Sequence, residues 1–375
     1  MPDLQLLDQQ FMRQALHEAR KGLGRTSPNP CVGAVIVHEG KVVATGYHRK
    51  AGTAHAEIHA LSRAGDLASG ATLYVTLEPC NHTGRTPPCS RAVARAGISR
   101  AVVGMEDPNP LVAGSGNAYL RSQGVEVVCG VLEKECRALN RPFIKQITTS
   151  LPWVILKAGM SLDGRITYQP QGGGAMTGPD SWRQVHRLRD RCDAILIGSS
   201  TVLTDDPALT TRLSRGGGRD PLRVILDSRL ALPEHAKVLH LESKAETWLF
   251  CGPDADSARI ARYAALDGVV VCQVESDGEG RLLLRQVLEI LGRAGVNSLL
   301  VEGGATIHGA FLLARLADQL TFFMAPILAG DQGLPVLQGL VAHGRAEAVS
   351  LMNVRYRRLG VDMMIEGEIV YPVIS

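Results

Sequence analysis

The sequence predicts an α/β protein of two domains. Its 375 residues are more than one hydrophobic core usually organises, and a hydrophobic content of 45% is enough for two packed cores. Short apolar runs typical of strands alternate with amphipathic runs typical of helices, which indicates layered α/β domains. Because a new strand follows Pro152, we place the boundary near Lys145 to Pro152 and expect domains over 1–148 and 149–375.

The N-terminal domain is expected to open with an amphipathic helix over 8–21. Apolar runs then predict strands at 32–37, 42–46, 72–77 and 101–104. One helix should begin at His55, with Ile58 and Leu61 facing inward, and another should begin after Cys89, at Ser90. Both helix starts therefore lie beside side chains that can bind a metal.

The C-terminal domain shows the same alternation of strands and helices. Its expected strands lie at 153–157, 194–198, 223–227, 247–251, 269–272 and 298–302. Gly303 and Gly304 separate the last strand from a helix that runs through 311–316. Glycines at such a turn let backbone N–H groups approach a phosphate at the positive end of the helix, but a plain tight turn explains them equally well.

His55, Glu57, Cys80 and Cys89 have the composition of a catalytic zinc site. One imidazole and two thiolates suit Zn²⁺, and three protein ligands leave the fourth tetrahedral position open for water. Bound zinc lowers the pKa of water to about 7, and a neighbouring glutamate can carry the proton to a leaving amine. Helix N-termini near the ligands favour thiolate over thiol. The pattern therefore predicts hydrolytic deamination.

The spacing of the two cysteines differs from that of a generic nucleobase deaminase. Such enzymes carry H-x-E with P-C-x-x-C, whereas eight residues separate Cys80 from Cys89. A structural zinc site would need a fourth protein ligand, which His59 or His82 could supply. His59 lies one helical turn after His55 and fits a helix-packing residue better.

The composition indicates which partners and which cellular compartment to expect. A net charge of +3 and an aromatic content of 4% give little support for a nucleic acid partner. Eight cysteines without regular spacing indicate a reducing compartment rather than a disulfide framework. Residues 1–20 lack the features of a signal peptide, and charged residues interrupt the best membrane-span candidate, 310–328. We expect a cytoplasmic enzyme with a small-molecule substrate and no association with membranes.

Several motifs together resemble one enzyme family. In the first domain they are SPNPCVGA at 27–34, HAEIHAL at 55–61, the segment 76–89 that contains both cysteines, and DPNP at 107–110. In the second domain they are KAGMSLDG at 157–164, TVLTDDP at 201–207 and VEGG at 301–304. Over nearly its whole length the chain resembles the bifunctional deaminase/reductase of riboflavin biosynthesis, a family that shows the same spacing between the cysteines.

The resemblance implies a cytidine-deaminase-like α/β/α fold for the first domain and a dihydrofolate-reductase-like α/β fold for the second. The first domain would deaminate diaminohydroxyphosphoribosylaminopyrimidine with the help of zinc. The second would use NADPH to reduce the ribosyl group to a ribityl group, which gives 5-amino-6-(5-phosphoribitylamino)uracil. The family also leads us to expect a homodimer or a homotetramer.

The resemblance also implies roles for individual residues. His55, Cys80 and Cys89 would hold zinc, and Glu57 would transfer protons. The residues expected to line the deaminase pocket are Asn29, His48, Arg85, Asp107 and Asn109, with Arg85 near the substrate phosphate. Those expected to contact the reductase substrate are Lys157, Arg189, Leu209, Arg212 and Glu302. Those expected to contact NADPH are Gly159, Thr201, Asp205, Ser228, Gly304, Ala305, Thr306, Ile307, His308 and Gly309.

Two features of the second domain complicate these assignments. Arg189 belongs to a run with Arg183, Arg187 and Arg191 that could equally be a solvated helix face. The family commonly carries a serine and a tryptophan where this chain has Gly173 and Ala175. A hydroxyl contact to the substrate and an aromatic wall for the cofactor would therefore be absent.

Two other functions fit parts of the pattern. A zinc deaminase of a nucleoside, a nucleobase or an RNA base, with a nucleotide-binding second domain, would use the same first domain. It would leave the motifs at 157–164 and 301–309 unexplained. A nucleotide sensor with a structural zinc site would not need Glu57.

Overall fold

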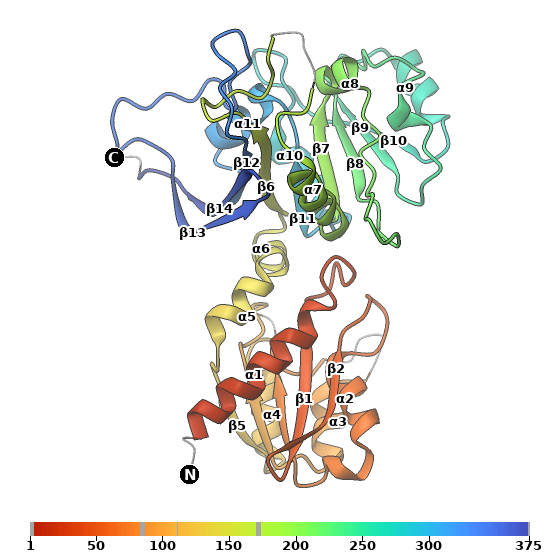
Figure 1. Ribbon diagram of the computed structural model, residues 1–375. Coiled ribbons are helices and arrows are strands. Elements are labelled where there is room, and N and C mark those ends of the chain that lie inside the picture. Colours follow the sequence, from red (N-terminus) through yellow and green to blue (C-terminus); the bar gives the residue numbers. More distant parts are fainter. Residues whose placement is uncertain (1–3, 83–86, 111, 170–173, 374–375) are drawn as a thin grey trace. The chain divides into compact units, whose positions relative to one another are not determined.

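The computed structural model describes residues 4–82, 87–110, 112–169 and 174–373. The chain divides into two compact units, Met1–Ser150 and Leu151–Ser375, and each has its own sheet and helices (Figure 1). None of the described helices combines the length and the apolarity needed to cross a bilayer.

The first unit is built on a five-stranded mixed sheet. Its strands are β1 (Gly33–His38), β2 (Lys41–Tyr47), β3 (Thr72–Val75), β4 (Arg100–Val103) and β5 (Glu126–Cys129). They lie in the order β2-β1-β3-β4-β5; β1 is antiparallel to β2 and β3, whereas β3, β4 and β5 are parallel. The apolar β1 and β3 are almost fully buried, as expected for strands covered on both faces.

Helices cover both faces of this sheet. They are α1 (Leu4–Arg20), α2 (Ala56–Ala64), α3 (Cys89–Arg95), α4 (Ser115–Ser122), α5 (Glu133–Leu139) and α6 (Arg141–Thr149), with the 3-10 helix η1 (Gly65–Ala68). A side chain at Gly33 would collide with the backbone of Ala15 in α1, and one at Gly46 with the backbone of Ala56 in α2. Gly46 pairs with Ala34, the neighbour of Gly33, and adjacent residues of a strand point to opposite faces. Helices α1 and α2 therefore pack on opposite faces, and the start of α2 is held directly against β2.

The second unit contains a nine-stranded sheet. Its strands are β6 (Trp153–Met160), β7 (Ala194–Gly198), β8 (Leu222–Leu226), β9 (Thr247–Cys251), β10 (Val269–Gln273), β11 (Ser298–Val301), β12 (Gln319–Met324), β13 (Ser350–Leu359) and β14 (Asp362–Val370). They lie in the order β10-β9-β8-β7-β11-β6-β12-β14-β13. The strands from β10 to β12 are parallel, β14 is antiparallel to β12, and β13 is antiparallel to β14. The helices are α7 (Pro179–Arg191), α8 (Ser199–Asp205), α9 (Ser257–Ala264), α10 (Leu284–Arg293) and α11 (Ala305–Leu313), with the 3-10 helix η2 (Lys237–Leu239).

The strand order determines where a site can form in the second unit. Strands β6 and β7 are consecutive in the chain, but β11 lies between them, so the order of the strands reverses there. Open parallel sheets bind ligands at the carboxyl ends of the strands beside such a reversal. Because Val301 of β11 pairs with Leu156 of β6, Glu302 comes beside Lys157. The topology thus brings together two residues that are far apart in the sequence.

The alternation of strands and helices expected from the sequence is confirmed. Each expected strand is present, and its ends differ from the expected ones by at most three residues. Four strands are additional to those expected, namely β5, β12, β13 and β14. Three of these complete the second sheet beyond β6.

Candidate functional site

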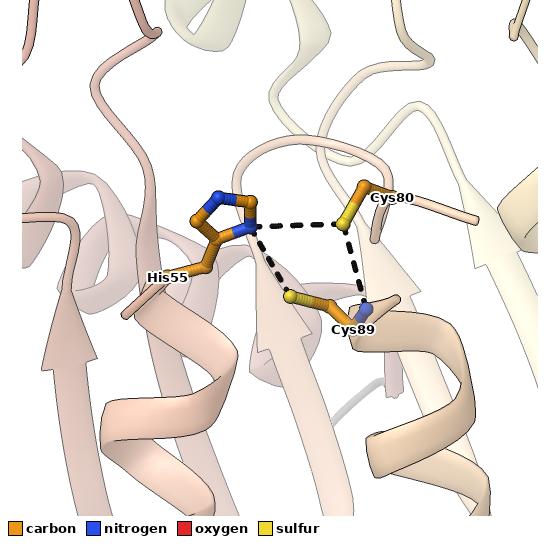
Figure 2. A group of neighbouring side chains, drawn as sticks. All are labelled: His55, Cys80 and Cys89. Atoms are coloured by element: carbon orange, nitrogen blue, oxygen red, sulfur yellow. Dashed lines mark hydrogen bonds between the residues drawn. The ribbon is translucent and has the colours of Figure 1, made fainter. Parts of the chain in front are cut away.

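Three side chains that can bind a metal converge in the first unit (Figure 2). His55 immediately precedes α2, Cys80 follows β3, and Cys89 is the first residue of α3. The Nδ1 atom of His55 lies 3.6 Å from the Sγ atom of Cys80 and 3.2 Å from that of Cys89. All three ligand atoms lie within 4.8 Å of one another, which is close enough for one ion to contact them all.

The donor set fits a catalytic zinc ion. One imidazole nitrogen and two sulfur atoms are ligands that zinc prefers, and three protein ligands leave a fourth position open. Within the described part of the chain, neither His59 nor His82 joins this group, so no fourth protein ligand closes it. Hydrogen bonds from Cys89 and His55 lower the pKa of the Cys80 thiol, although burial opposes them. This shift favours the thiolate, the form that binds metals.

Glu57 lies in the first turn of α2, two residues after His55. Its side chain lines the same cavity as His55 and Cys80, although the residue is only 3% exposed. Burial raises the pKa of Glu57 to about 7, against the lowering effect of His55. A carboxyl group with a pKa near neutrality can both accept and release a proton at the pH of the cell.

The cavity beside these residues has a volume of about 530 Å³. Four residues expected in the deaminase pocket line it, namely Asn29, His48, Asp107 and Asn109, whereas Arg85 lies outside the described residues. His48 is held from both sides, since its Nδ1 lies 3.2 Å from the carbonyl oxygen of Ala54 and its Nε2 lies 3.1 Å from Nδ2 of Asn29. Burial lowers the pKa of His48, so the ring is neutral, with Nδ1 as donor and Nε2 as acceptor.

Glu78, which sequence reasoning missed, organises one wall of this cavity. Its carboxylate accepts hydrogen bonds from the backbone N–H groups of Asp107, Gly114, Gly116 and Asn117, at 2.8 to 3.1 Å. The residue is 5% exposed and lines the cavity, so these bonds hold the segment that carries Asp107. The sequence offered one indication of this role, because Glu78 lies two residues before Cys80 within the same motif.

Phe143 and Ile147 also line the cavity and were not expected from the sequence. Both belong to α6, which has no fully buried residue. The amphipathic pattern of α6 is the sequence feature that could have predicted this apolar wall, because its apolar face is not fully covered by the core.

The second unit holds a buried cluster of three charged residues that were all expected in the reductase site. The carboxylate of Glu302 lies 3.1 Å from Nζ of Lys157 and accepts two hydrogen bonds from Arg189, at 2.8 and 2.9 Å. The side chains of Lys157, Arg189 and Glu302 are 16%, 12% and 8% exposed, so the interpretation of Arg189 as part of a solvated face is wrong. Burial favours a raised pKa, but Arg189 and Lys157 outweigh it and hold the pKa of Glu302 below its usual value.

A cavity of about 190 Å³ adjoins this cluster. Lys157, Gly159, Arg189 and Arg212, which were expected in the site, line it. Several residues that sequence reasoning missed line it too, namely Gly174, Met176, Thr177, Trp182, Val185 and His186. Ala175 is also part of the wall, whereas Gly173 lies outside the described residues.

Leu209 and Glu302 were expected to contact the reductase substrate but do not line this cavity. Leu209 has a left-handed backbone conformation, with φ at +53°, and a buried side chain. Its neighbour Thr210 accepts a hydrogen bond from Arg189 through its carbonyl oxygen, at 3.2 Å. Leu209 can therefore meet a ligand only through its backbone, and Glu302 supports Lys157 and Arg189 from behind.

The residues expected to contact the cofactor lie at or just after the ends of adjacent strands. Gly159 lies in β6, Gly304 precedes α11 after β11, Thr201 and Asp205 lie in α8 after β7, and Ser228 follows β8. These strands are neighbours in the order β8-β7-β11-β6. The candidates therefore lie along one edge of the sheet, and Gly159 is the one that also lines the described cavity.

Within the turn into α11, the backbone is more available to a ligand than the side chains are. A side chain built at Gly304 would meet no atom within 4 Å. Ile307 packs against Gly198 and Gly303, and His308 is buried between the carbonyl oxygens of Val301 and Val336. Of the other residues expected here, Ala305 is buried, Thr306 is hydrogen-bonded to Gln338, and Gly309 packs on the Gln338 backbone. This open backbone at a helix N-terminus suits a phosphate group.

Comparisons with known proteins cover both units. Residues 6–105 match the family model of the cytidine and deoxycytidylate deaminase zinc-binding region, and residues 152–365 match that of the RibD C-terminal domain. The chain is 43% identical to riboflavin biosynthesis protein RibD of Bacillus amyloliquefaciens over 331 residues, which is 88% of each protein. It is 40% identical to that of Escherichia coli (strain K12) over 372 residues, which is 96% of this chain and 98% of that protein.

Solved structures agree with the sequence comparisons. The structure of Acinetobacter baumannii RibD, form 1, matches with a TM-score of 0.87 at 34% identity, over 98% of this chain and 99% of that one. A Thermotoga maritima protein described as diaminohydroxyphosphoribosylaminopyrimidine deaminase/5-amino-6-(5-phosphoribosylamino)uracil reductase matches with a TM-score of 0.83 at 34% identity, over 99% and 100%. The first unit thus has the cytidine-deaminase-like fold and the second the dihydrofolate-reductase-like fold. This chain belongs to the RibD family and is a bifunctional deaminase and reductase of riboflavin biosynthesis.

Proposed function

We propose that residues 1–148 deaminate a pyrimidine that carries a phosphoribosylamino group, and that residues 149–375 reduce the ribose of the product to ribitol with NADPH. The description of the Thermotoga maritima protein names both reactions. The observation that carries the first half is the convergence of His55, Cys80 and Cys89 beside the buried Glu57. The second half is supported by the cavity beside the paired Lys157, Arg189 and Glu302.

In the deaminase site His55, Cys80 and Cys89 would hold a zinc ion. The ion would bind a water molecule and lower its pKa. Glu57, with its pKa near 7, would take the proton from the attacking water and deliver it to the amine that leaves.

The other residues of this cavity would hold the substrate. Asn29 is fixed by its hydrogen bond to His48 and can orient the pyrimidine ring with its remaining amide groups. Asp107 and Asn109 line the cavity on the segment that Glu78 holds, so their positions are set before the substrate arrives. Arg85 remains our candidate for the substrate phosphate, since an arginine suits a phosphate by its bidentate geometry.

In the reductase site the charged cluster would place two cations against the substrate. Glu302 fixes Lys157 and Arg189, and their remaining N–H donors would bind the ribose and its phosphate. Arg212 is anchored through Nη1 to Oγ1 of Thr210, at 3.1 Å, and would bind the phosphate together with Arg189. Leu209 would contribute backbone groups only.

NADPH would supply the hydride that reduces the ribose carbon. Its phosphates would bind backbone N–H groups of the turn from Gly304 to Gly309, because this turn opens α11 at the carboxyl edge of the sheet. Thr201, Asp205 and Ser228 follow adjacent strands and would contact the rest of the cofactor, and Gly159 would contact it from the cavity wall. The inward side chains of Ile307 and His308 would support this turn rather than touch the cofactor.

A coupled assay tests both halves. The zinc-loaded chain is given diaminohydroxyphosphoribosylaminopyrimidine and NADPH, and both ammonia release and NADPH oxidation are followed. We expect one NADPH oxidised for each ammonia released. Ammonia without NADPH oxidation would contradict the reductase assignment, and neither signal would contradict the whole proposal.

We further propose a homodimer or homotetramer in the cytoplasm. All eight cysteines are free, and two of them are candidate zinc ligands, which suits a reducing compartment. Light scattering of the purified chain measures the assembly directly. A monomer at micromolar concentration would contradict the oligomer.

A further inference from the structure

His186 lies at the reductase cavity but has no role in the proposed reduction. It lies on α7, three residues before Arg189, and its side chain lines the cavity together with those of Arg189 and Arg212. Residues three apart on a helix share a face, so the imidazole and the Arg189 guanidinium project in the same direction. The residue is 8% exposed, which leaves the cavity as its access to a ligand.

The hydrogen bonds of His186 determine which nitrogen carries its proton. Nδ1 accepts the backbone N–H of Arg212, at 3.2 Å. Burial lowers the pKa of His186, and the charges of Arg189 and Arg212 lower it further, so the ring is neutral near pH 7. A neutral imidazole has one donor and one acceptor nitrogen. Since Nδ1 is the acceptor, Nε2 carries the hydrogen.

The Nε2–H group has no partner within the described part of the chain. No described residue accepts a hydrogen bond from it, and Nε2 is not among the nitrogens that are enclosed and unpaired. A donor that faces a cavity in this way is available to a ligand. Removing it from water without a partner would be costly, which favours a ligand that accepts a hydrogen bond there.

The charges around the cavity define the ligand group. Lys157, Arg189 and Arg212 bring three positive charges, and Glu302 compensates one of them. The excess of two suits a phosphate dianion. His186 lies close to both arginines, because it shares the α7 face of Arg189, accepts the backbone N–H of Arg212 and lines the same cavity as both.

We infer that His186 is a third phosphate-binding residue of the reductase site, whose Nε2–H donates to the substrate phosphate while its Nδ1 holds the Arg212 backbone. This inference rests on the proposed reductase function. The neutral His186 ring adds a hydrogen-bond donor without adding charge, so the phosphate is recognised by geometry as well as by electrostatic attraction.

Two substitutions separate the two nitrogens of His186. In His186→Asn the amide oxygen can replace Nδ1 as the acceptor for Arg212, but nothing reaches the position of Nε2. In His186→Gln the amide nitrogen can reach that position, but the Nδ1 acceptor is lost. Arg183→Gln, on an exposed part of the same helix, is the matched control. Binding of ribose 5-phosphate to the full chain is measured by calorimetry, beside the KM and kcat of the reductase.

A hydrogen bond to a charged group corresponds to a change of about tenfold or more in affinity. We expect His186→Asn to weaken ribose 5-phosphate binding by about that factor and to raise KM with little change in kcat. We expect His186→Gln and Arg183→Gln to stay within about threefold of the wild type. An Asn variant within that range, or a Gln variant that loses as much as the Asn variant, would overturn the inference.

The same measurements distinguish a failure of the proposed reductase reaction from a failure of the His186 inference. A wild-type chain that binds ribose 5-phosphate but does not oxidise NADPH with the deaminated substrate would contradict the proposed reaction. The comparison of the two His186 variants would still decide whether Nε2 binds phosphate.

Discussion

Each of the two units has one buried glutamate at its site, and the two glutamates behave in opposite ways. Glu57 and Glu302 are both buried, with Glu57 at 3% exposure and the Glu302 side chain at 8%. Burial raises the pKa of Glu57 to about 7, whereas Arg189 and Lys157 hold the pKa of Glu302 below its usual value. The difference shows that a paired cation, rather than burial itself, decides whether a buried carboxyl group keeps its proton.

The chemistry of the two sites follows from this difference. A carboxyl group that gains and loses a proton near pH 7 can carry protons in a reaction, as proposed for Glu57. A carboxylate that stays ionised can only hold its cations in place, as proposed for Glu302.

Substitution of Glu57 by Gln should lower the rate of ammonia release by about 100-fold or more, because the proton carrier is lost. Zinc content and NADPH oxidation with the deaminated substrate should stay at wild-type levels. The matched control is Glu133→Gln, which changes an exposed glutamate of the same unit. Full ammonia release by the Glu57 variant would show that its carboxyl group carries no proton in the reaction.

Substitution of Glu302 by Gln should destabilise the second unit, because Lys157 and Arg189 would be left buried without their counter-charge. Breaking a buried pair in this way costs about 3 kcal/mol. Urea unfolding followed by the fluorescence of the tryptophans, all of which lie in the second unit, measures the loss. Glu279→Gln, which removes an exposed partner of Arg281, should change the midpoint little. Equal midpoints for the two variants would contradict the role of Glu302.

The stability of the second unit should depend on acid through Glu302. Its pKa is lower in the folded chain than in the unfolded one, where it is about 4.3. The stabilisation is therefore present above about pH 4.3 and is lost as the pH falls toward the folded value. The wild type should thus lose more stability than Glu302→Gln between pH 5 and pH 3. Parallel losses in the two proteins would contradict this assignment.

Substitution of Glu78 by Gln should raise the KM of the deaminase by about tenfold. Each carboxylate oxygen accepts two backbone N–H groups, and an amide nitrogen can accept neither of its pair. The segment with Asp107 would move, while the zinc ligands would stay. Kinetics of ammonia release and zinc analysis test this. A variant with normal KM but less zinc would instead place Glu78 in support of Cys80.

Substitution of Trp182 by Ala should raise the KM for NADPH by only about threefold, since an aromatic contact contributes about 0.5 to 1.5 kcal/mol. Trp182 lines the reductase cavity with Ala175, and its indole N–H is fixed to the carbonyl oxygen of Thr177, at 3.0 Å. It could provide the aromatic wall missing at Ala175. Trp182→Phe should stay near the wild-type KM, and a loss equal to that of the Ala variant would argue against this wall.

The zinc site could be predicted from the sequence because its parts are local. His55 and Glu57 lie at one helix start, and Cys80 and Cys89 lie at the ends of one loop. The pattern of residue types defines the ligands even before the fold is known. The role of Glu78 could not be predicted, because its four donors lie 29 to 39 residues further along the chain.

The reductase site depends more on topology. Glu302 meets Lys157 because β11 inserts between β6 and β7, and no local pattern shows that insertion. The same order makes Arg189 a buried residue rather than part of a solvated face. Strand β13 was missed because most of its side chains are exposed, so it lacks the apolar run that predicts a buried strand.

The most direct test measures both activities in Glu57→Gln and in Glu302→Gln. Each variant is given the deaminase substrate in one experiment and the reductase substrate with NADPH in another. We expect Glu57→Gln to lose ammonia release and keep NADPH oxidation, and Glu302→Gln to keep ammonia release and lose NADPH oxidation. Loss of both activities in either variant would contradict the claim that each unit carries one reaction with its own buried glutamate.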